Sequence, residues 1–327
     1  MRKQLRVWWF GLSLLFFVAM PLVAQNDVGE MLVTLVGTGG PEITADRAGI
    51  STLVEVDGQK LLFDAGWGTL DGLYKSRILP QTVTRVFLTH LHSDHISGLP
   101  DLWMTPWFLL GRTAKLEVWG PVGTQAMIDG MRRMYAHDLE HRSNAKFKRE
   151  NLDVLVHEIQ PGVIYAQGGV MVSSVSVEHA DGNPAFAYLV QASKHAVFLT
   201  GDCTYGPELV MAAPHVDVLI SNVVAGTPEL ESSAQWKPVM AKLMLPEQAA
   251  KLFEETKPRL AVYSHIVKKG LPGAAGDGVI LKRTRDAGYK GSLLMGEDHT
   301  RIVVGKTVEV RRVTGPLPEL DGPDVRF

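Results

Sequence analysis

Cysteine is nearly absent from this chain of 327 residues, since Cys203 is the only one. A single thiol cannot form an intramolecular disulfide, so stability has to come from a hydrophobic core and from any bound metal. The first 25 residues contain no cysteine, which excludes a lipoprotein anchor there. We expect Cys203 to be a small, buried apolar residue.

The sequence also lacks an excess of charge of either sign and has no low-complexity run. It carries 33 basic and 35 acidic residues, for a formal charge of −2, and is 46% hydrophobic. Such a composition is typical of a globular protein. Because a near-neutral surface gives no sign of a polyanion track, we expect no nucleic acid partner.

The N-terminal region differs in composition from the rest of the chain. Basic Arg2, Lys3 and Arg6 precede an apolar run of 18 residues that ends at Ala24. This pattern predicts a signal peptide over residues 1–24, with the mature chain beginning near Gln25 in the periplasm or outside the cell. If the run is not cleaved, it is long enough to be a membrane anchor, and it is then the only contact with a membrane that we expect.

Residues 25–327 read as one domain in which strands and helices alternate. Short runs of β-forming residues bounded by turns predict strands over 31–40, 51–66, 84–90 and 115–121. Apolar residues at helical spacing predict helices over 122–142, after a cap at Thr124, and over 245–257. The interleaved pattern favours an α/β protein built from two similar halves.

The most informative stretch is "LTHLHSDH", which ends in an H-x-H-x-D-H motif. It contains His90, His92, Asp94 and His95 at the predicted end of a strand. Alternation along an extended segment places the first three on one side, and a turn brings His95 to join them. Imidazole and carboxylate groups are ligands for zinc and its first-row neighbours.

Three further metal-capable residues follow apolar strands later in the chain. His179 follows "VSSVSVE", Asp202 follows "HAVFLTG", and His265 follows "RLAVYS". Together with the first cluster they form a set of seven ligands. Such a set can hold two divalent ions, with three ligands on each and one carboxylate between them.

With these motifs, and with "LVGTGGP", "LLFDAG" and "EHADGNPAFAYLV", the chain from about Met31 to Val304 resembles the metallo-β-lactamase superfamily. It is similar in particular to the ribonuclease Z and arylsulfatase-like branch. The resemblance implies a four-layer αββα sandwich with two metal ions, zinc first, although manganese or iron suits the same ligands. By position, one ion is bound by His90, His92 and His179, the other by Asp94, His95 and His265, and Asp202 bridges them.

The expected activity is that of an exported hydrolase that attacks a small-molecule ester with a metal-bound hydroxide. Two ions roughly 3.5–4 Å apart can generate this nucleophile at neutral pH. Asp94 and Asp202 are the expected catalytic residues, and Asp64 is a candidate to orient a ligand histidine. A phosphodiester or an aryl sulfate is the expected substrate, with an aromatic wall formed by at least one of Trp103, Trp107 and Phe108.

The sequence departs from ribonuclease Z at one motif. Ser221 and Asn222 stand where those enzymes carry a His-Glu pair, and no basic, Gly/Pro-rich arm is evident. We therefore expect a substrate other than precursor transfer RNA. Lactone or β-lactam hydrolysis, a non-catalytic metal-binding scaffold and a homodimer remain open, whereas a flavodiiron protein needs a glutamate in place of His92 and a flavin domain.

Overall fold

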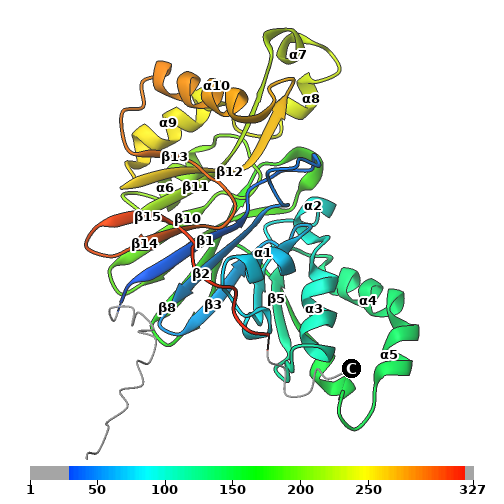
Figure 1. Ribbon diagram of the computed structural model, residues 1–327. Helices are drawn as coiled ribbons and strands as arrows, with labels where there is room; N and C mark the ends of the chain where they lie inside the picture. The colour runs from blue at the N-terminus through cyan, green and yellow to red at the C-terminus, as the bar shows by residue number, and fades with distance from the viewer. Residues whose placement is uncertain (1–28, 321–327) are drawn as a thin grey trace, which may run out of the picture.

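The computed structural model describes residues 29–320 as two mixed β-sheets packed face to face, with helices on both outer sides (Figure 1). The predicted signal peptide lies outside the described residues, so its cleavage and the export of the chain stay predictions. Among residues 29–320, no helix has the length and apolar character that crossing a membrane requires.

Each sheet contains an antiparallel part and a parallel part. The first has the order β15-β14-β1-β2-β3-β4-β5-β6, and the second has the order β13-β12-β11-β10-β9-β8-β7. Strands β14 to β3 pair antiparallel and β3 to β6 pair parallel; β7 to β10 pair antiparallel and β10 to β13 pair parallel. This repeated plan matches the two similar halves expected from the sequence.

The first sheet consists of β1 (Met31–Gly37), β2 (Ser51–Val56), β3 (Gln59–Phe63), β4 (Arg85–Phe87), β5 (Leu116–Gly120), β6 (Val154–Glu158), β14 (Thr300–Val304) and β15 (Val308–Arg312). The second consists of β7 (Gly162–Gln167), β8 (Val170–Val177), β9 (Ala185–Ala192), β10 (His195–Leu199), β11 (Val218–Gly226), β12 (Leu260–Lys269) and β13 (Leu293–Met295).

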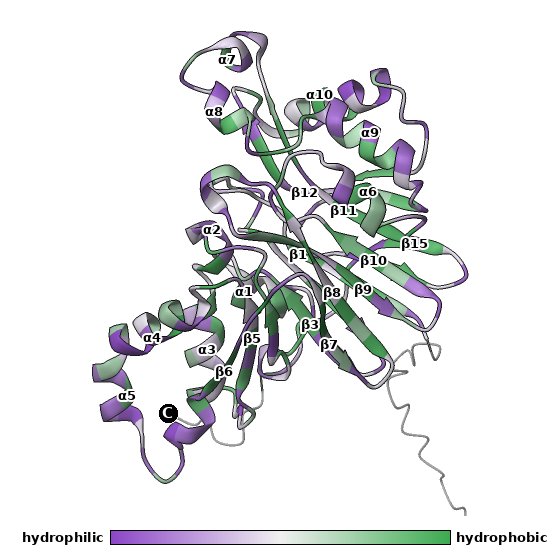
Figure 2. Cartoon of the chain, turned by 180° about the vertical axis from the view of Figure 1, so that it is seen from behind, coloured by the Kyte–Doolittle hydropathy of each residue, from purple (hydrophilic) through white to green (hydrophobic). Residues whose placement is uncertain are grey.

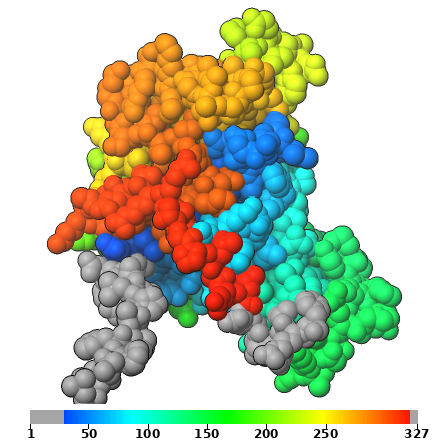
Figure 3. All heavy atoms as spheres, in the orientation of Figure 1, coloured from blue at the N-terminus to red at the C-terminus, as the bar shows by residue number. Residues whose placement is uncertain are grey.

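The helices form the outer layers. The first sheet is accompanied by α1 (Thr69–Lys75), α2 (Ser93–Ile96), α3 (Leu99–Phe108), α4 (Thr124–Met134) and α5 (Ala136–Arg142). The second is accompanied by α6 (Pro207–Ala212), α9 (Pro246–Thr256) and α10 (Gly273–Asp286). Two short helices, α7 (Pro228–Ser232) and α8 (Lys237–Met240), lie in a segment that projects from the body at the top of Figure 3.

Three apolar clusters separate the four layers. One lies between the sheets, one between the first sheet and its helices, and one between the second sheet and α6, α9 and α10. Figure 2 shows the same division, with apolar strands inside and hydrophilic helix surfaces outside. The αββα sandwich predicted from the sequence is therefore confirmed.

Most local predictions agree with the structure. Helix α9 begins at Pro246. Proline suits the first turn of a helix, because backbone N–H groups there have no intrahelical acceptor and the missing N–H of proline costs no hydrogen bond. The helix predicted over 122–142 is divided into α4 and α5 at Tyr135, and Gly123 rather than Thr124 precedes it. Cys203 is fully buried, as expected.

Phe87 is the centre of the aromatic packing between the two sheets. Its ring stacks on Trp119 at a centroid distance of 4.6 Å and on Phe63 at 5.1 Å, and it meets Tyr188 at 6.0 Å. We expect Phe87→Ala to lower the free energy of unfolding by about 3–5 kcal/mol, because it removes apolar contacts and leaves a cavity.

Guanidinium unfolding followed by circular dichroism measures this change. Val122→Ala is the control, because Val122 is 60% exposed and its truncation should change stability by less than about 0.5 kcal/mol. Equal stabilities for the two variants would contradict the assignment of Phe87 to the core.

Candidate metal centre

The H-x-H-x-D-H motif forms a loop and one turn of helix. The strand expected to reach His90 ends at Phe87, and Asp94 and His95 lie in α2. Two residues after β4, the backbone N–H and the hydroxyl of Thr89 donate to the buried carboxylate of Asp64 and hold the chain in this loop. The motif side chains therefore converge through a loop and not through strand alternation, which corrects the sequence expectation.

The downstream ligands enter from the second sheet. His179 follows β8, and Asp202 follows β10 after a glycine, Gly201, with φ +59°. His265, expected at the end of a strand, lies inside β12. Its register with β11 shifts between Ser221 and Val223, so that two residues, Ser264 and His265, oppose one residue, Asn222.

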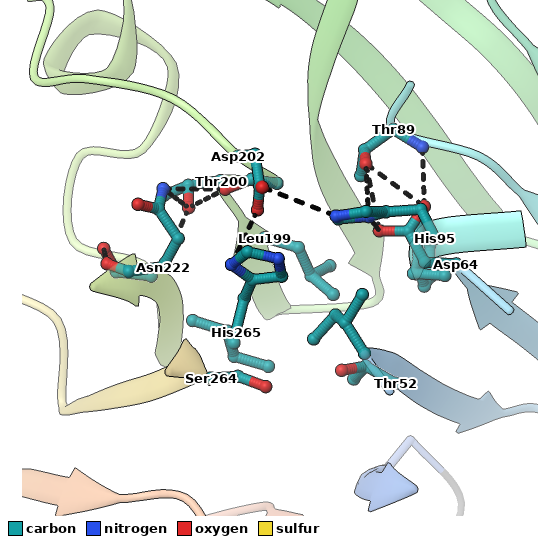
Figure 4. A pocket seen from close by; sticks show the side chains of 15 residues that line it. Thr52, Asp64, Thr89, His95, Leu199, Thr200, Asp202, Asn222, Ser264 and His265 are labelled. Carbon is teal, nitrogen blue, oxygen red and sulfur yellow. Dashed lines mark hydrogen bonds and ion pairs between the residues drawn. The ribbon is translucent and has the colours of Figure 1, made fainter. Parts of the chain in front are cut away.

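This bulge explains how a residue inside a strand reaches the site. A β-bulge redirects side chains locally, and His265 has a left-handed backbone with φ +49°. The seven predicted residues consequently meet between the two sheets, at one edge of the sandwich. Figure 4 shows Asp202 between His95 and His265.

The converging side chains form three groups whose ligand atoms all lie within 4.8 Å of one another. These groups are His90, His92 and His179; Asp94, His95 and His265; and His90, His95 and Asp202. The first two groups are the two ion sites that the family resemblance implies, and the third places Asp202 between them. The geometry agrees with the predicted ligand set, and metal binding by each residue stays a prediction.

The buried atoms of the site fit a pair of metal ions. Nε2 of His90, Nε2 of His95, Oδ1 of Asp202 and Nδ1 of His265 are buried, and none forms a hydrogen bond of regular geometry in the part of the chain that the structure describes. Asp202 Oδ1 and His265 Nδ1 face each other at 3.1 Å, and His95 Nε2 lies 3.4 Å from the other oxygen of Asp202. Buried polar atoms are normally paired, so such a cluster of ligand atoms needs an explanation. Coordination of cations supplies one.

The electrostatics of the site point in the same direction. Burial by itself lowers the pKa of His95, but the carboxylates of Asp64 and Asp202 raise that pKa well above its ordinary value. Burial opposes ionisation of Asp94, yet its hydrogen bond with His265 and the proximity of His95 bring its pKa below the usual range. Against the effect of burial, neighbouring imidazoles lower the pKa of Asp202 as well, so Asp94 and Asp202 stay ionised and favour positive charge between them.

Two hydrogen bonds orient ligand histidines. Nδ1 of His95 lies 2.9 Å from Oδ2 of Asp64, and Nδ1 of His179 lies 3.0 Å from the backbone carbonyl of Lys242. In each case Nε2 is left to face the site. The contact expected of Asp64 with a candidate ligand histidine is present, and its orienting role stays a prediction. The Lys242 carbonyl was missed, because every residue has a carbonyl and no sequence pattern marks this one.

The aromatic residues of α3 do not form the expected wall of the site. Trp103 and Trp107 are buried in the cluster between the first sheet and its helices, and their indole N–H groups donate to Leu152 and Lys148 carbonyls. Phe108 packs against the same cluster and lies 4.3 Å from the Arg142 guanidinium. The periodicity of α3 directs these side chains to the core, so the expectation was wrong.

Comparison with known proteins identifies relatives over most of the chain. Residues 59–266 match the family model described as a beta-lactamase superfamily domain. Ribonuclease Z of Mycobacterium marinum is 32% identical over 195 residues, which cover 59% of this chain and 70% of that protein.

Two solved structures share the fold. The metallo-β-lactamase fold protein YhfI from Bacillus subtilis aligns with a TM-score of 0.64 and 18% identity, covering 84% of this chain and 100% of that one. The short form of human tRNase Z aligns with a TM-score of 0.62 and 22% identity, covering 83% and 98%.

These relatives correct the function expected from the sequence. Hydrolysis of a small-molecule ester without any nucleic acid partner conflicts with curated relatives named as ribonucleases, so this expectation is wrong. Net charge is a weak guide here, because it averages over the whole surface and does not report the charge at one site.

Asp64 offers a test of the orienting contacts. We expect Asp64→Asn to weaken the binding of divalent metal by about 10- to 100-fold, because the change replaces the carboxylate that fixes His95. Chelator competition with Zn²⁺ measures the affinity. Asp217→Asn is the matched control, since Asp217 forms a buried pair with His195 outside the metal groups. Equal losses in the two variants would contradict the assignment.

The ligand set and the family model coincide along the chain. All seven predicted ligands fall within the matched residues 59–266, which end one residue after His265. The protein is a metal-dependent hydrolase that acts on ester bonds. The chain belongs to the metallo-β-lactamase superfamily, in the branch that contains ribonuclease Z.

Proposed function

We propose that this protein is a phosphodiesterase that cleaves RNA with two divalent ions, zinc being the first candidate. The observation that carries the proposal is the arrangement of the seven side chains into two three-ligand groups joined through Asp202. The ribonuclease Z relatives support RNA as the substrate class, and the matched superfamily domain contains the whole set.

We assign each of the seven residues to one of the two ions or to both. His90, His92 and His179 hold one ion, Asp94, His95 and His265 hold the other, and Asp202 contacts both groups. Two such ions, when bound, activate water and stabilise negative charge on the oxygens of a phosphoryl group. Five neutral imidazoles and two carboxylates leave the loaded site with a net positive charge, which favours a phosphodiester anion over a neutral ester.

Asp94 is more exposed than the neighbouring ligands Asp202 and His95. Its side chain is 13% exposed, compared with 5% for Asp202 and 0% for His95. Its Oδ2 lies 3.1 Å from Nε2 of His265, and its lowered pKa keeps it ionised. We therefore assign to Asp94 the orientation of the attacking water, from which an ionised carboxylate accepts a hydrogen bond, and to Asp202 the fixing of both metal groups.

The metal content is the first test of this proposal. We expect the purified protein, reconstituted with zinc, to contain close to two equivalents per chain by elemental analysis. Because metal that binds only the folded state stabilises it by mass action, removal by a chelator should lower the melting temperature. A content near zero after reconstitution with both zinc and manganese would contradict the site.

The second test uses single-residue variants. Asp94→Asn and His92→Ala should each lower turnover of RNA by at least about 100-fold while circular dichroism shows an intact fold. His92 precedes the single turn α2, Asp94 lies in that turn, and neither is fully buried in the core. His141→Ala and His215→Ala, at exposed positions outside the metal groups, should stay within a few-fold of the parent. Comparable losses at all four positions would show that the wrong histidines were chosen.

The substrate class requires a separate comparison. We expect the metal-loaded protein to cleave an RNA oligonucleotide and to leave a fluorogenic carboxylic ester intact. The products, separated by gel electrophoresis, should disappear in the Asp94→Asn variant. Efficient ester hydrolysis with no RNA cleavage would overturn the assignment of RNA while leaving the metal site in place.

A further inference from the structure

We propose that Asn222 is a positioning residue that holds two metal ligands, Asp202 and His179, in the positions from which they bind metal. The inference rests on the metal-binding part of the proposed function and extends it to a residue outside the ligand set. Asn222 stands where ribonuclease Z enzymes carry part of a His-Glu motif, so the sequence alone suggested the loss of a function at this position.

Asn222 is a buried amide at an irregular point of the second sheet. It is 2% exposed and lies in β11, opposite the bulge of β12 that delivers His265 to the site. A buried carboxamide is costly unless its donors and acceptor are paired. The partners of this side chain therefore define what it does.

The amide nitrogen holds the turn that carries Asp202. Nδ2 of Asn222 donates to the carbonyl of Gly201 at 2.8 Å and to the carbonyl of Cys203 at 3.1 Å. These carbonyls belong to the residues on either side of Asp202, whose position between the ligand histidines depends on this turn (Figure 4). Two bonds from one nitrogen fix the backbone on both sides of the bridging carboxylate.

The amide oxygen holds the segment that orients His179. Oδ1 of Asn222 accepts from the backbone N–H of Met244 at 2.9 Å, and the Met244 carbonyl accepts from Val224 at 2.9 Å. Two residues before Met244, the Lys242 carbonyl accepts from Nδ1 of His179 at 3.0 Å. The segment that follows α8 is thereby anchored to β11 and presents its carbonyl to the ligand.

The chemistry of the side chain suits a structural link and not acid–base catalysis. A carboxamide does not titrate in the physiological range, and its oxygen and nitrogen are already occupied. Only an amide supplies both donors and an acceptor at this place. Aspartate, although of the same shape, would keep the bond from Met244 but direct negative charge at two carbonyl oxygens.

The test compares Asn222→Asp and Asn222→Ala with the parent protein. Zn²⁺ affinity is measured by chelator competition, and the visible absorption spectrum is recorded after Co²⁺ substitution, at a temperature where circular dichroism shows a folded chain. We expect at least one metal equivalent to bind about 10- to 100-fold more weakly in each variant, with an altered Co²⁺ spectrum.

Thr284→Val is the control for loss of a buried hydrogen bond away from the metal. Its hydroxyl is bonded to Tyr263 and to the Ile280 carbonyl, and Thr284 is fully buried. This variant should lose stability but keep the metal affinity and the Co²⁺ spectrum of the parent.

Retention of both parental affinities in a folded Asn222 variant would overturn the proposal. Failure of both variants to fold would also overturn it, because it would assign the residue to the fold and not to the site. If the parent itself binds no metal, the metal assignment fails first, and the two failures are thus distinguished.

Discussion

The burial of the Asp202 carboxylate is the constraint on which the site depends. One or other of its oxygens lies 3.1 Å from His265, 3.4 Å from His95 and 3.7 Å from His179, and its side chain is only 5% exposed. An ionised carboxylate in such surroundings costs several kcal/mol unless positive charge compensates it. Imidazoles from both sheets supply nitrogen atoms around it, so the site is completed by cations.

This constraint gives the two-sheet architecture its functional meaning. His90 follows β4 of the first sheet, whereas His179, Asp202 and His265 come from β8, β10 and β12 of the second. Neither sheet alone can assemble the set. The apolar layer between the sheets therefore holds the two halves of the site in register, and the stacked rings around Phe87 lie in that layer.

A layer of hydrogen bonds stands behind the ligands. Asp64 fixes His95, the Lys242 carbonyl fixes His179, and Asn222 joins the turn of Asp202 to the segment of Lys242. These contacts connect residues far apart in the sequence, and they fix the orientation of the ligand side chains. A ligand rotated out of place leaves its buried donor or acceptor unpaired, which is why such supports matter nearly as much as the ligands.

The sequence by itself determined the types and order of the candidate ligands, and its resemblance to a known family predicted the layered fold. The motif from His90 to His95 could be recognised because its four metal-capable residues lie within six neighbouring positions. The later candidate ligands could be recognised because each follows or lies in an apolar run. Helix α9 was equally accessible, since periodicity and a proline in the first turn are local signals.

Only the tertiary structure decided the rest. Three features depend on contacts between segments that are distant in the sequence, and such contacts leave no local pattern. They are the bulge at His265, the Lys242 carbonyl that orients His179, and the hydrogen bonds of Asn222. The burial of Trp103 and Trp107 depended on which face of α3 meets the sheet. Net charge could not reveal the substrate class, because it sums over the whole surface and does not report the charge at one site.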